Sequence, residues 1–426
     1  MRFRSRLSRC AAAAAATVAI AACSSGGGQS TNPGSGGSSA SSGAGATKLT
    51  WFMWSGSNEE AAAWKHVGEL VTKKYPDITV DFQTTDFNNY WTKLTTQAAS
   101  GQAPCVIGLQ GQRAPQFGKL LVPLDDYMSK AGIKAADFVP SITKGLQVDG
   151  KQVALPYDVG PFMMFYNVDA FKAAGLKAPA IGWTMEEFLA DAKALTKPPK
   201  YGFFAGSDIG ALMPWTLSQT GKAAVNDSGK LMLDTPEWKQ AGQWYADLIT
   251  KEHVAAQIPT ANSSSASANQ FLAGNAYMSL DGPWDLINSR ALAKFGVGIA
   301  PVPAGASGSQ TWTDGSGFGV TKNCKSPDAA FKAVSVMTGP DAEAYLGDAG
   351  RAFPARTAQQ DSWYTGNKVS DVKPVMDYSL EHSVPFRTIP TWQQVATTFA
   401  RYAVPAFNGQ TSVSALLSQA QAQAPS

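Results

Sequence analysis

Histidine is scarce in this chain, and the residue patterns of several common enzyme sites are absent from it. The three histidines, His66, His253 and His382, are far apart in the sequence and have no metal-ligand spacing. No H-E-x-x-H motif, no G-x-S-x-G nucleophile elbow and no G-x-x-x-x-G-K-[ST] phosphate loop occurs. The sequence therefore gives no support to a zinc protease, a serine hydrolase of the elbow type or a P-loop nucleotide-binding enzyme.

The chain also lacks a basic surplus once its first residues are set aside. Residues 1–22 carry four arginines and no acidic residue, so removing them changes the formal net charge from +3 to −1. A chain of this charge has no general electrostatic attraction for nucleic acid or anionic lipid. We therefore expect no nucleic-acid partner.

A membrane-spanning run is absent near the N-terminus, where a shorter apolar run occurs instead. Residues 11–22 are small and apolar over about a dozen positions, against the roughly 20 that a spanning helix needs. The arginines before them are typical of a signal peptide. The end of the run, Ile20-Ala21-Ala22-Cys23, resembles the bacterial lipobox, whose cysteine is lipidated and becomes the new N-terminus. We expect residues 1–22 to be a lipoprotein signal peptide; an ordinary secretory signal followed by a chance cysteine is the alternative.

The segment after Cys23 has the composition of a tether. Residues 24–47 are almost entirely Ser, Gly and Ala, with one proline and no charge. Such a segment behaves as a flexible coil, and two dozen residues of it span roughly 25–30 Å. A diacyl anchor on Cys23 would hold firmly, where a single acyl chain would be marginal. We therefore expect a folded part that is lipid-anchored at the extracytoplasmic face of a bacterial cell membrane.

Cysteine is nearly as scarce as histidine, and its four positions are accounted for by export. Cys10 leaves with the signal peptide and Cys23 takes the lipid, so Cys105 and Cys324 remain. In an oxidising compartment a disulfide is the default expectation for such a pair. Two separately buried thiols are the alternative.

Alternating strand and helix patterns begin the folded part. Apolar runs predict strands over residues 48–54, 78–82 and 105–109, with a helix after the first strand and another over residues 89–100. Asn58 can cap the first of these helices, with two glutamates in its first turn. This β-α-β-α-β order implies a parallel sheet with helices on both faces. Ligands bind such sheets beyond the carboxyl ends of the strands, which points to Trp54–Ser57 and Gln110–Arg113.

The remainder of the chain continues the mixture of strands and helices. Residues 48–426 are too many for one core of ordinary size, so we expect two lobes. The predicted strands cover residues 162–167, 276–280, 296–300 and 317–321. The predicted helices cover residues 184–196, 236–250, 267–273 and 327–338.

Eight segments, in this order, carry a resemblance to one family. They are Trp51-Phe-Met-Trp-Ser55, Ser100-Gly-Gln-Ala-Pro-Cys-Val-Ile107, Leu121-Val-Pro-Leu-Asp-Asp126, Leu155-Pro-Tyr-Asp158 with Phe165–Phe171, Gly182-Trp-Thr-Met-Glu-Glu-Phe188, Phe271–Trp284, Ile299-Ala-Pro-Val-Pro303 and Asp314-Gly-Ser-Gly317. Together they resemble the extracellular solute-binding proteins of bacterial carbohydrate ABC importers, family 1, which are maltose-binding-protein-like. The resemblance covers nearly all of residues 48–426 and does not specify the sugar.

The resemblance implies an α/β fold of two lobes, each a mainly parallel sheet flanked by helices, with a ligand cleft between them. Lobe one is expected to be residues 48–155 plus 312–345, and lobe two residues 156–311 plus 346–426. The lobes are expected to close on the ligand by a hinge. The implied partners are a carbohydrate and the permease subunits of an ABC transporter, with the chain itself a monomer.

A sugar offers hydroxyl groups, which suit amides, carboxylates and guanidinium groups, and flat C–H faces, which suit aromatic rings. Trp284, presented by the turn at Gly282, matches a tryptophan that stacks on sugar in the family. Trp215 and Trp392 match aromatic regions of the second lobe. Trp54, beside Ser55 at a strand end, is either a ligand platform or a core residue. Most of the 12 tryptophans are expected to be core.

The polar candidates lie in other segments of the resemblance. Gln112 and Arg113 align with an Asp-Arg pair of maltose-binding protein, so an amide stands where that carboxylate would be, which weakens any transfer of maltose specificity. Gly315 and Ser316 can offer a backbone N–H and a hydroxyl. Asp158 and Arg351 are further candidates: a surface salt bridge is the alternative for Asp158, and a bridge between the lobes is the alternative for Arg351.

Two other functions remain open from the sequence, and both differ from sugar capture. An extracellular glycan hydrolase would need two carboxylates about 5–10 Å apart, and no recognisable paired motif provides them. A binding protein of the same fold for a peptide, metal or anion is the other alternative. We expect no enzyme activity and no cofactor. The family arrangement also places the strand that begins at Cys105 antiparallel to residues 317–321, within disulfide distance of Cys324.

Overall fold

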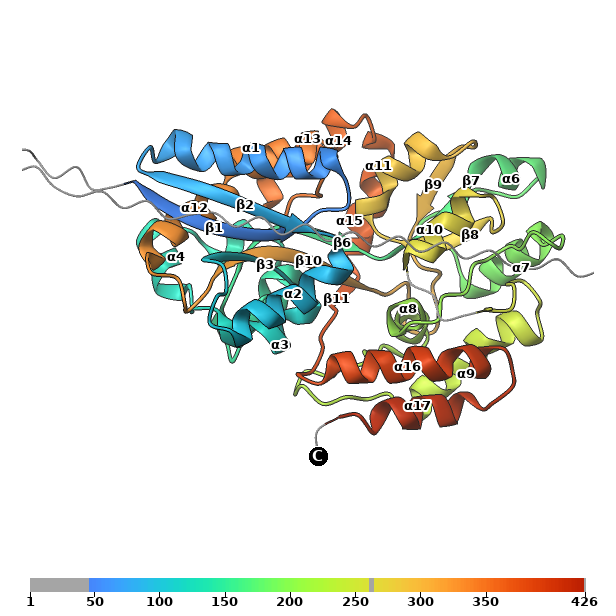
Figure 1. The fold of residues 1–426 in the computed structure, drawn as a ribbon. Helices are drawn as coiled ribbons and strands as arrows, with labels where there is room; N and C mark the ends of the chain where they lie inside the picture. The colour runs from blue at the N-terminus through green and yellow to red at the C-terminus, as the bar shows by residue number, and fades with distance from the viewer. Residues whose placement is uncertain (1–45, 260–263, 425–426) are drawn as a thin grey trace, which may run out of the picture. The chain divides into compact units, whose positions relative to one another are not determined.

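The structure is a computed structural model that describes residues 46–259 and 264–424. The chain divides into two units, residues 1–44 and 45–426, and the second holds all the described helices and strands (Figure 1). The predicted signal peptide, the lipidated Cys23 and nearly all of the linker lie outside the described residues.

The first sheet follows the predicted β-α-β-α-β order. Its central strands pair in parallel, β2-β1-β3, and β10 continues the sheet antiparallel to β3. β6 pairs antiparallel with β10, and β11 pairs parallel with it. The strands are β1 (Thr47–Trp54), β2 (Ile78–Thr85), β3 (Val106–Gln110), β6 (Leu155–Pro161), β10 (Thr311–Val320) and β11 (Ser383–Pro385). A small hairpin joins β4 (Gln147–Val148) and β5 (Lys151–Gln152).

Helix α1 (Asn58–Lys74) begins one residue earlier than its predicted cap implied. Ser57, not Asn58, is the N-cap: its backbone is extended and its hydroxyl accepts a hydrogen bond of 3.1 Å from the N–H of Glu60. Asn58 is the first helical residue, so its side chain is not in the capping position. Glu59 and Glu60 lie in the first turn as predicted, where a negative charge is favourable.

The second sheet differs from the expectation of mainly parallel pairing. Its order is β8-β7-β9, and both pairs are antiparallel. β8 and β9 run in the same direction because α11 connects them, but β7 arrives from β6 in the opposite direction and lies between them. The elements are β7 (Met163–Asn167), β8 (Met278–Asp281), α11 (Pro283–Leu292) and β9 (Val297–Ala300).

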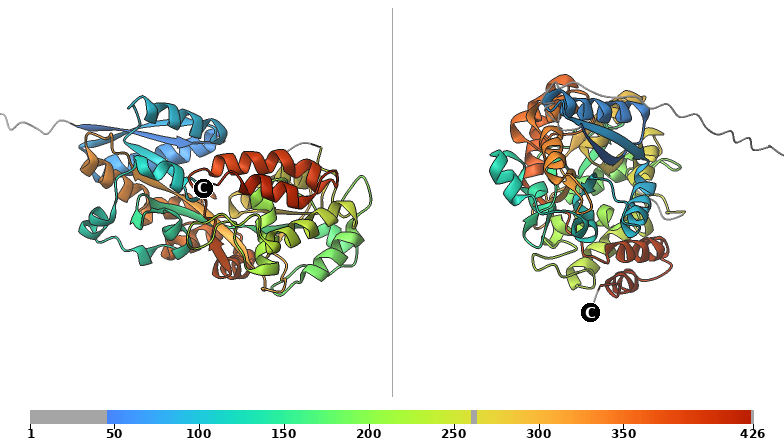
Figure 2. Two further views of the ribbon diagram at one scale, coloured as in Figure 1. Left: turned by 90° about the horizontal axis from the view of Figure 1, so that it is seen from below. Right: turned by 60° about the vertical axis from the view of Figure 1, so that its left-hand side comes forward.

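Two hydrophobic cores are built on these sheets. The helices that contribute buried residues to the first core include, besides α1, α2 (Phe87–Ala99), α3 (Ala114–Phe117), α4 (Asp125–Ala131), α5 (Pro140–Gly145), α12 (Pro327–Met337), α13 (Pro340–Asp348), α14 (Gln360–Gly366) and α15 (Lys373–Glu381). The second core is formed mainly by α6 (Val168–Ala173), α7 (Met185–Leu195), α8 (Ile209–Thr220), α9 (Pro236–Thr250), α16 (Trp392–Phe407) and α17 (Val413–Gln421). In Figures 1 and 2, α9, α16 and α17 lie side by side. α10 (Ser264–Leu272) packs beside β8.

The chain passes between the two cores at several places, and strands of the second sheet place side chains in both: Phe165 and Ile299 lie in the first core, Met164 and Ala300 in the second. Val159 belongs to the first core and Phe162 to the second, Trp312 to the second and Phe318 to the first, and the last passage lies between α15 and β11. α14 and α15 pack into the first core, whereas the expected boundary placed everything after residue 345 in lobe two. The lobe boundaries stay a proposal, and this packing favours a last boundary between α15 and β11.

The disulfide between Cys105 and Cys324 is present, with a Cα–Cα distance of 4.5 Å. β3 and β10 are antiparallel neighbours in which Val106 pairs with Val320, as the resemblance implied. The backbone N–H of Thr321 donates to the carbonyl of Cys105 at 2.9 Å, which holds the two chain segments together at this end of the sheet. The bridge therefore joins the amino end of β3 to the carboxyl end of β10.

Candidate ligand-binding site

The carboxyl edge of the first sheet carries a hollow that contains a predicted site residue. β1 ends at Trp54 and β2 at Thr85, and the chain turns there into α1 and α2. The hollow has a volume of about 540 Å³, within the roughly 300–1,000 Å³ usual for small-ligand sites. It is lined by Ser55, Gly56, Ser57, Asn58, Glu59, Ala61, Thr84, Thr85 and Asp86. Ser55 therefore lies where the parallel-sheet rule places a ligand.

An ion pair stands beside this hollow. Arg351 Nη2 lies 2.5 Å from Glu60 Oε1, and the guanidinium group lies 4.7 Å from the ring centroid of Trp64. Glu60 Oε2 accepts a hydrogen bond of 2.8 Å from the N–H of Gly56, which lines the hollow. Arg351 Nε is buried with no hydrogen-bond partner among the described residues. Arg351 thus joins the segment after α13 to the start of α1 and keeps a donor unused.

Two carboxyl groups lie on one face of the β6–β10 ribbon. Ser316 is opposite Asp158 and Asp314 is opposite Gly160, so Asp158, Asp314 and Ser316 share a face by strand alternation. The N–H of Ser316 donates to Asp158 Oδ1 at 2.5 Å, beside a bulge in the ribbon. A Cβ on Gly315 would lie 2.3 Å from the Asp158 carbonyl oxygen, so only glycine allows this approach of the strands.

Burial controls the charge of this face. It raises the pKa of Asp158 to about 7, against the opposing effects of Arg351 and the Ser316 N–H. It also raises the pKa of Asp314 to about 7, against hydrogen bonds from the Gly315 backbone and the Gln112 side chain, while the negative charge of Asp158 adds to the rise. Both carboxyl groups therefore change protonation near neutral pH.

Gln112 and Arg113 belong to the short helix η1 (Gly111–Arg113), which follows β3 at the same edge of the sheet. The hydroxyl of Thr388 donates to the Gln112 carbonyl at 2.7 Å, and Arg113 Nη1 donates to Gln393 Oε1 at 2.7 Å. The Arg113 guanidinium group lies 5.2 Å from the ring centroid of Trp91. Both residues are thereby fixed against the segment that follows β11.

Trp284 lies at the start of α11, in a helical first turn and not in a free turn. Its side chain is 37% exposed, and its ring is nearly parallel to those of Phe162 and Trp312, at a centroid distance of 6.4 Å from each. A Cβ on Gly160 would lie 2.9 Å from the Trp284 ring, and one on Gly282 would lie 2.2 Å from it. Because these two glycines have no side chain, they leave room for the Trp284 ring. The ring therefore lies beside Gly160, which is opposite Asp314 in the ribbon.

The other tryptophans on the candidate list are placed among packed rings. Trp215 is fully buried and contacts Phe188 in the second core. Trp392 is 6% exposed, and Trp54 is 8% exposed and packs against Trp91. Trp54 thus packs against the Trp91 ring on which Arg113 lies. Of its two alternatives, ligand platform or core residue, this packing corresponds to the core residue.

The structure gathers most of the remaining candidates at one place. The carboxyl edge of the first sheet, the β6–β10 ribbon and the start of α11 bring together Ser55, Gln112, Arg113, Asp158, Gly282, Trp284, Gly315, Ser316 and Arg351 through the contacts described above. Sequence reasoning did not select Glu60, Gly160 or Asp314 as site residues. Asp314 stood in a segment that carried the resemblance, while nothing in the sequence linked Glu60 to Arg351.

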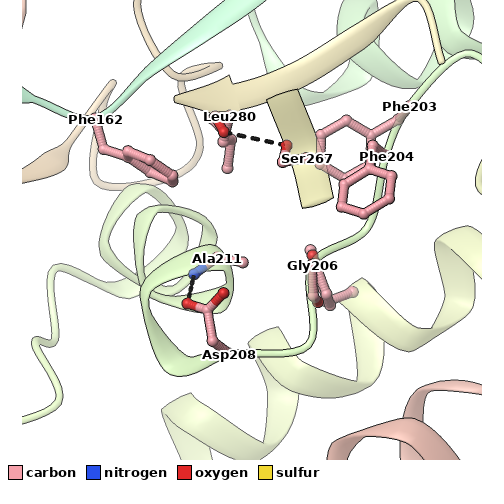
Figure 3. A pocket seen from close by; sticks show the side chains of 9 residues that line it. Phe162, Phe203, Phe204, Gly206, Asp208, Ala211, Ser267 and Leu280 are labelled. Atoms are coloured by element: carbon pink, nitrogen blue, oxygen red, sulfur yellow. Dashed lines mark hydrogen bonds between the residues drawn. The ribbon is translucent and has the colours of Figure 1, made fainter. Parts of the chain in front are cut away.

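Two further hollows lie outside this group of residues. One, shown in Figure 3, is bordered by Phe162, Phe204 and Asp208, and the Asp208 carboxylate accepts from the N–H of Ala211 at 3.0 Å. Its volume of about 10 Å³ is water-sized and excludes a sugar ring. The other has a volume of about 460 Å³ and is bordered by Lys222, Asp227 and Arg387 among others, but it contains no predicted site residue.

Within residues 46–259 and 264–424, no helix has the length and apolar character that crossing a membrane requires. In the same residues, no group of three or more His, Cys, Asp or Glu side chains is arranged to hold a metal ion.

Comparison with known proteins places the chain in a family. The family model for bacterial extracellular solute-binding proteins matches residues 33–344, and the chain belongs to this family. A putative binding protein of Brucella abortus (strain 2308) is 24% identical over 388 residues, which cover 84% of this chain and 88% of that one.

Solved structures confirm the fold class. The ABC substrate-binding protein Lmo0181 of Listeria monocytogenes, in complex with cycloalternan, matches with a TM-score of 0.78 at 23% identity, covering 88% of this chain and 97% of that one. Maltose-bound MalE3 of T. maritima matches with a TM-score of 0.73 at 22% identity, covering 88% and 98%. The fold is the two-lobed α/β fold of the ABC solute-binding proteins, as the sequence resemblance implied.

Proposed function

We propose that this protein captures a mono- or oligosaccharide outside the cytoplasm and delivers it, unchanged, to the permease of an ABC transporter. The observation that carries the proposal is the exposed ring of Trp284 beside a group of carboxyl, amide and guanidinium side chains. An aromatic face suits the C–H face of a pyranose, and the polar groups suit its hydroxyls. The cycloalternan and maltose complexes of proteins with this fold support a sugar as the ligand class.

Screening the mature protein for thermal stabilisation tests this function. A panel of mono- and oligosaccharides, with short peptides and inorganic anions as comparison ligands, should raise the melting temperature only with one group of sugars. A ligand at 100 times its dissociation constant adds about 2.7 kcal/mol to the free energy of unfolding, which is readily measured. Chromatography should recover the bound sugar intact. Stabilisation by a peptide or an anion alone, or steady release of reducing ends, would contradict the proposal.

The location of this function follows from the N-terminal sequence. We infer that residues 1–22 are removed, that Cys23 carries lipid, and that residues 24–47 tether a monomeric binding protein at the extracytoplasmic face of the membrane. Two anchoring chains on one cysteine would give stable attachment, and the uncharged linker would let the folded part reach a permease in the same membrane.

Replacing Cys23 with serine should release the protein from the membrane, because the residue that accepts the lipid is lost. Fractionation of the producing cells into membrane and soluble material measures the effect. Cys10→Ser is the matched control: this cysteine lies within the signal peptide, so the variant should stay with the membrane like the unaltered protein. A Cys23→Ser variant that remains fully membrane-bound would show that the lipobox interpretation is wrong.

A further inference from the structure

The side chain of Asp314 is buried in the candidate site with part of its hydrogen-bonding capacity unused. Asp314 is 5% exposed, and its Oδ2 has no hydrogen-bond partner among the described residues. Its other oxygen, Oδ1, lies against Gly111, where an added Cβ would approach it to 2.6 Å. A buried acceptor without a partner is uncommon in proteins and calls for a donor.

The groups around Asp314 fix its carboxyl group beside the ligand-facing residues. The Gln112 side chain and the Gly315 backbone hydrogen-bond to it, and Arg113 and Asp158 act on it through their charges. Asp314 is opposite Gly160, over which the ring of Trp284 lies. An aromatic face and an anionic acceptor are thus neighbours in this site.

We propose that Asp314 is a specificity-determining residue, whose carboxylate accepts a hydrogen bond from a hydroxyl group of the bound sugar while Gln112 and Arg113 hold it in place. The inference rests on the proposed function. An amide such as that of Gln112 both donates and accepts, whereas an ionised carboxylate only accepts and forms the stronger bond with a hydroxyl. Gln112 thus orients the acceptor, and Asp314 on strand β10 supplies the acceptor carboxylate.

This role makes sugar affinity depend on pH. Burial raises the pKa of Asp314 to about 7, so part of the ligand-free protein carries a protonated Asp314 at neutral pH. A hydroxyl that donates to this carboxyl group favours its ionised form, so affinity should fall as the pH is lowered from 8 to 5.5. Asp158 and Ser316 share its face of the ribbon, and Gln112 and Arg113 act on it from η1. Protonation of Asp158 contributes to the same pH range.

Stability should respond to pH in the opposite direction. A carboxyl group whose pKa is raised by folding binds protons more tightly in the folded state than in the unfolded state. Its destabilising effect is fully present above the folded pKa and is relieved as the pH falls towards the unfolded value. The ligand-free protein should therefore gain stability from Asp314 between pH 8 and pH 5.5, where sugar affinity declines.

The test is calorimetric titration at pH 5.5, 7 and 8 with the panel sugar that gives the largest thermal shift. Asp314→Asn should weaken binding at pH 8 at least tenfold and flatten the pH profile. The exchange variant Gln112→Glu/Asp314→Asn should recover much of that loss, because it returns a carboxylate to the pair. Asp191→Asn, at a carboxyl group in α7 that accepts from the indole of Trp183, is the matched control and should change neither affinity nor profile.

Two outcomes separate this inference from the function on which it rests. Absence of sugar binding by the unaltered protein would contradict the proposed function. Binding by folded Asp314→Asn within twofold of the unaltered protein, with the same pH profile, would overturn the role of Asp314 alone. If Asp314→Asn does not fold, Gln112→Glu provides the test: a second carboxylate beside Asp314 should move the midpoint of the pH profile upward, and an unmoved midpoint would overturn the inference.

Discussion

Replacing Cys105 and Cys324 together by alanine should lower the free energy of unfolding by about 2–5 kcal/mol, the range found for lost native disulfides. The bridge links residues 219 positions apart in the sequence, so the reduced chain has a long loop to close. The chain-entropy model gives about 5 kcal/mol as an upper figure for such a loop. Denaturant unfolding of the mature protein under non-reducing conditions measures the change.

The same double variant should bind sugar with unchanged affinity. The bridge is at the amino end of β3, whereas Gln112 and Arg113 follow its carboxyl end. The unaltered protein in reductant is the matched control and should unfold like the double variant. Free, alkylatable thiols at both positions in exported protein would contradict the account, and so would a loss of affinity without a loss of stability.

Replacing Trp284 by alanine should weaken sugar binding by about 1–3 kcal/mol, taking the scale of other flat rings that stack on aromatic side chains. Trp284 is 37% exposed, so removing its ring should cost less stability than the roughly 3–5 kcal/mol of a fully buried tryptophan. Calorimetric titration and denaturant unfolding of the same preparation measure the two effects separately.

Trp244→Ala is the matched control for this substitution. Trp244 is partly buried and packs against Trp215 at a centroid distance of 5.1 Å, away from the residues gathered at the candidate site. Its loss should lower stability and leave affinity unchanged. The reverse pattern at Trp284, a large loss of stability with unaltered affinity, would assign that residue to the core.

Local sequence patterns predicted the first sheet well because each of its early elements has a clear period and clear ends. Parallel order follows once strand and helix alternate, and α9 has the bounds that its pattern predicted. α8 has no such pattern: ten of its 12 residues are buried, so no polar face marks it, and Pro214 lies inside it. The antiparallel direction of β7 relative to β8 and β9 depends on the path of the chain from β6 into the second sheet. No local sequence pattern predicts that path.

Residues of the candidate site could be predicted where a single sequence segment was enough to select them. Trp284 was selected because its segment resembles the family, and Arg113 because it aligns with a family residue and follows the carboxyl end of a predicted strand. Glu60 could not be selected in this way, because its partner Arg351 is distant in the chain and meets it only when α1 and the segment after α13 pack together. Trp215 shows the converse: an aromatic residue in a matching segment can lie wholly in the core, and burial is decided by packing from several elements.

The most direct test of the central claim is an experimental structure of the mature protein with its panel sugar bound. The account predicts a sugar ring lying against the face of Trp284, with one hydroxyl within hydrogen-bond distance of Asp314 and others near Arg113 or Asp158. A sugar bound elsewhere on the molecule, with Trp284 and these polar side chains uncovered, would contradict it.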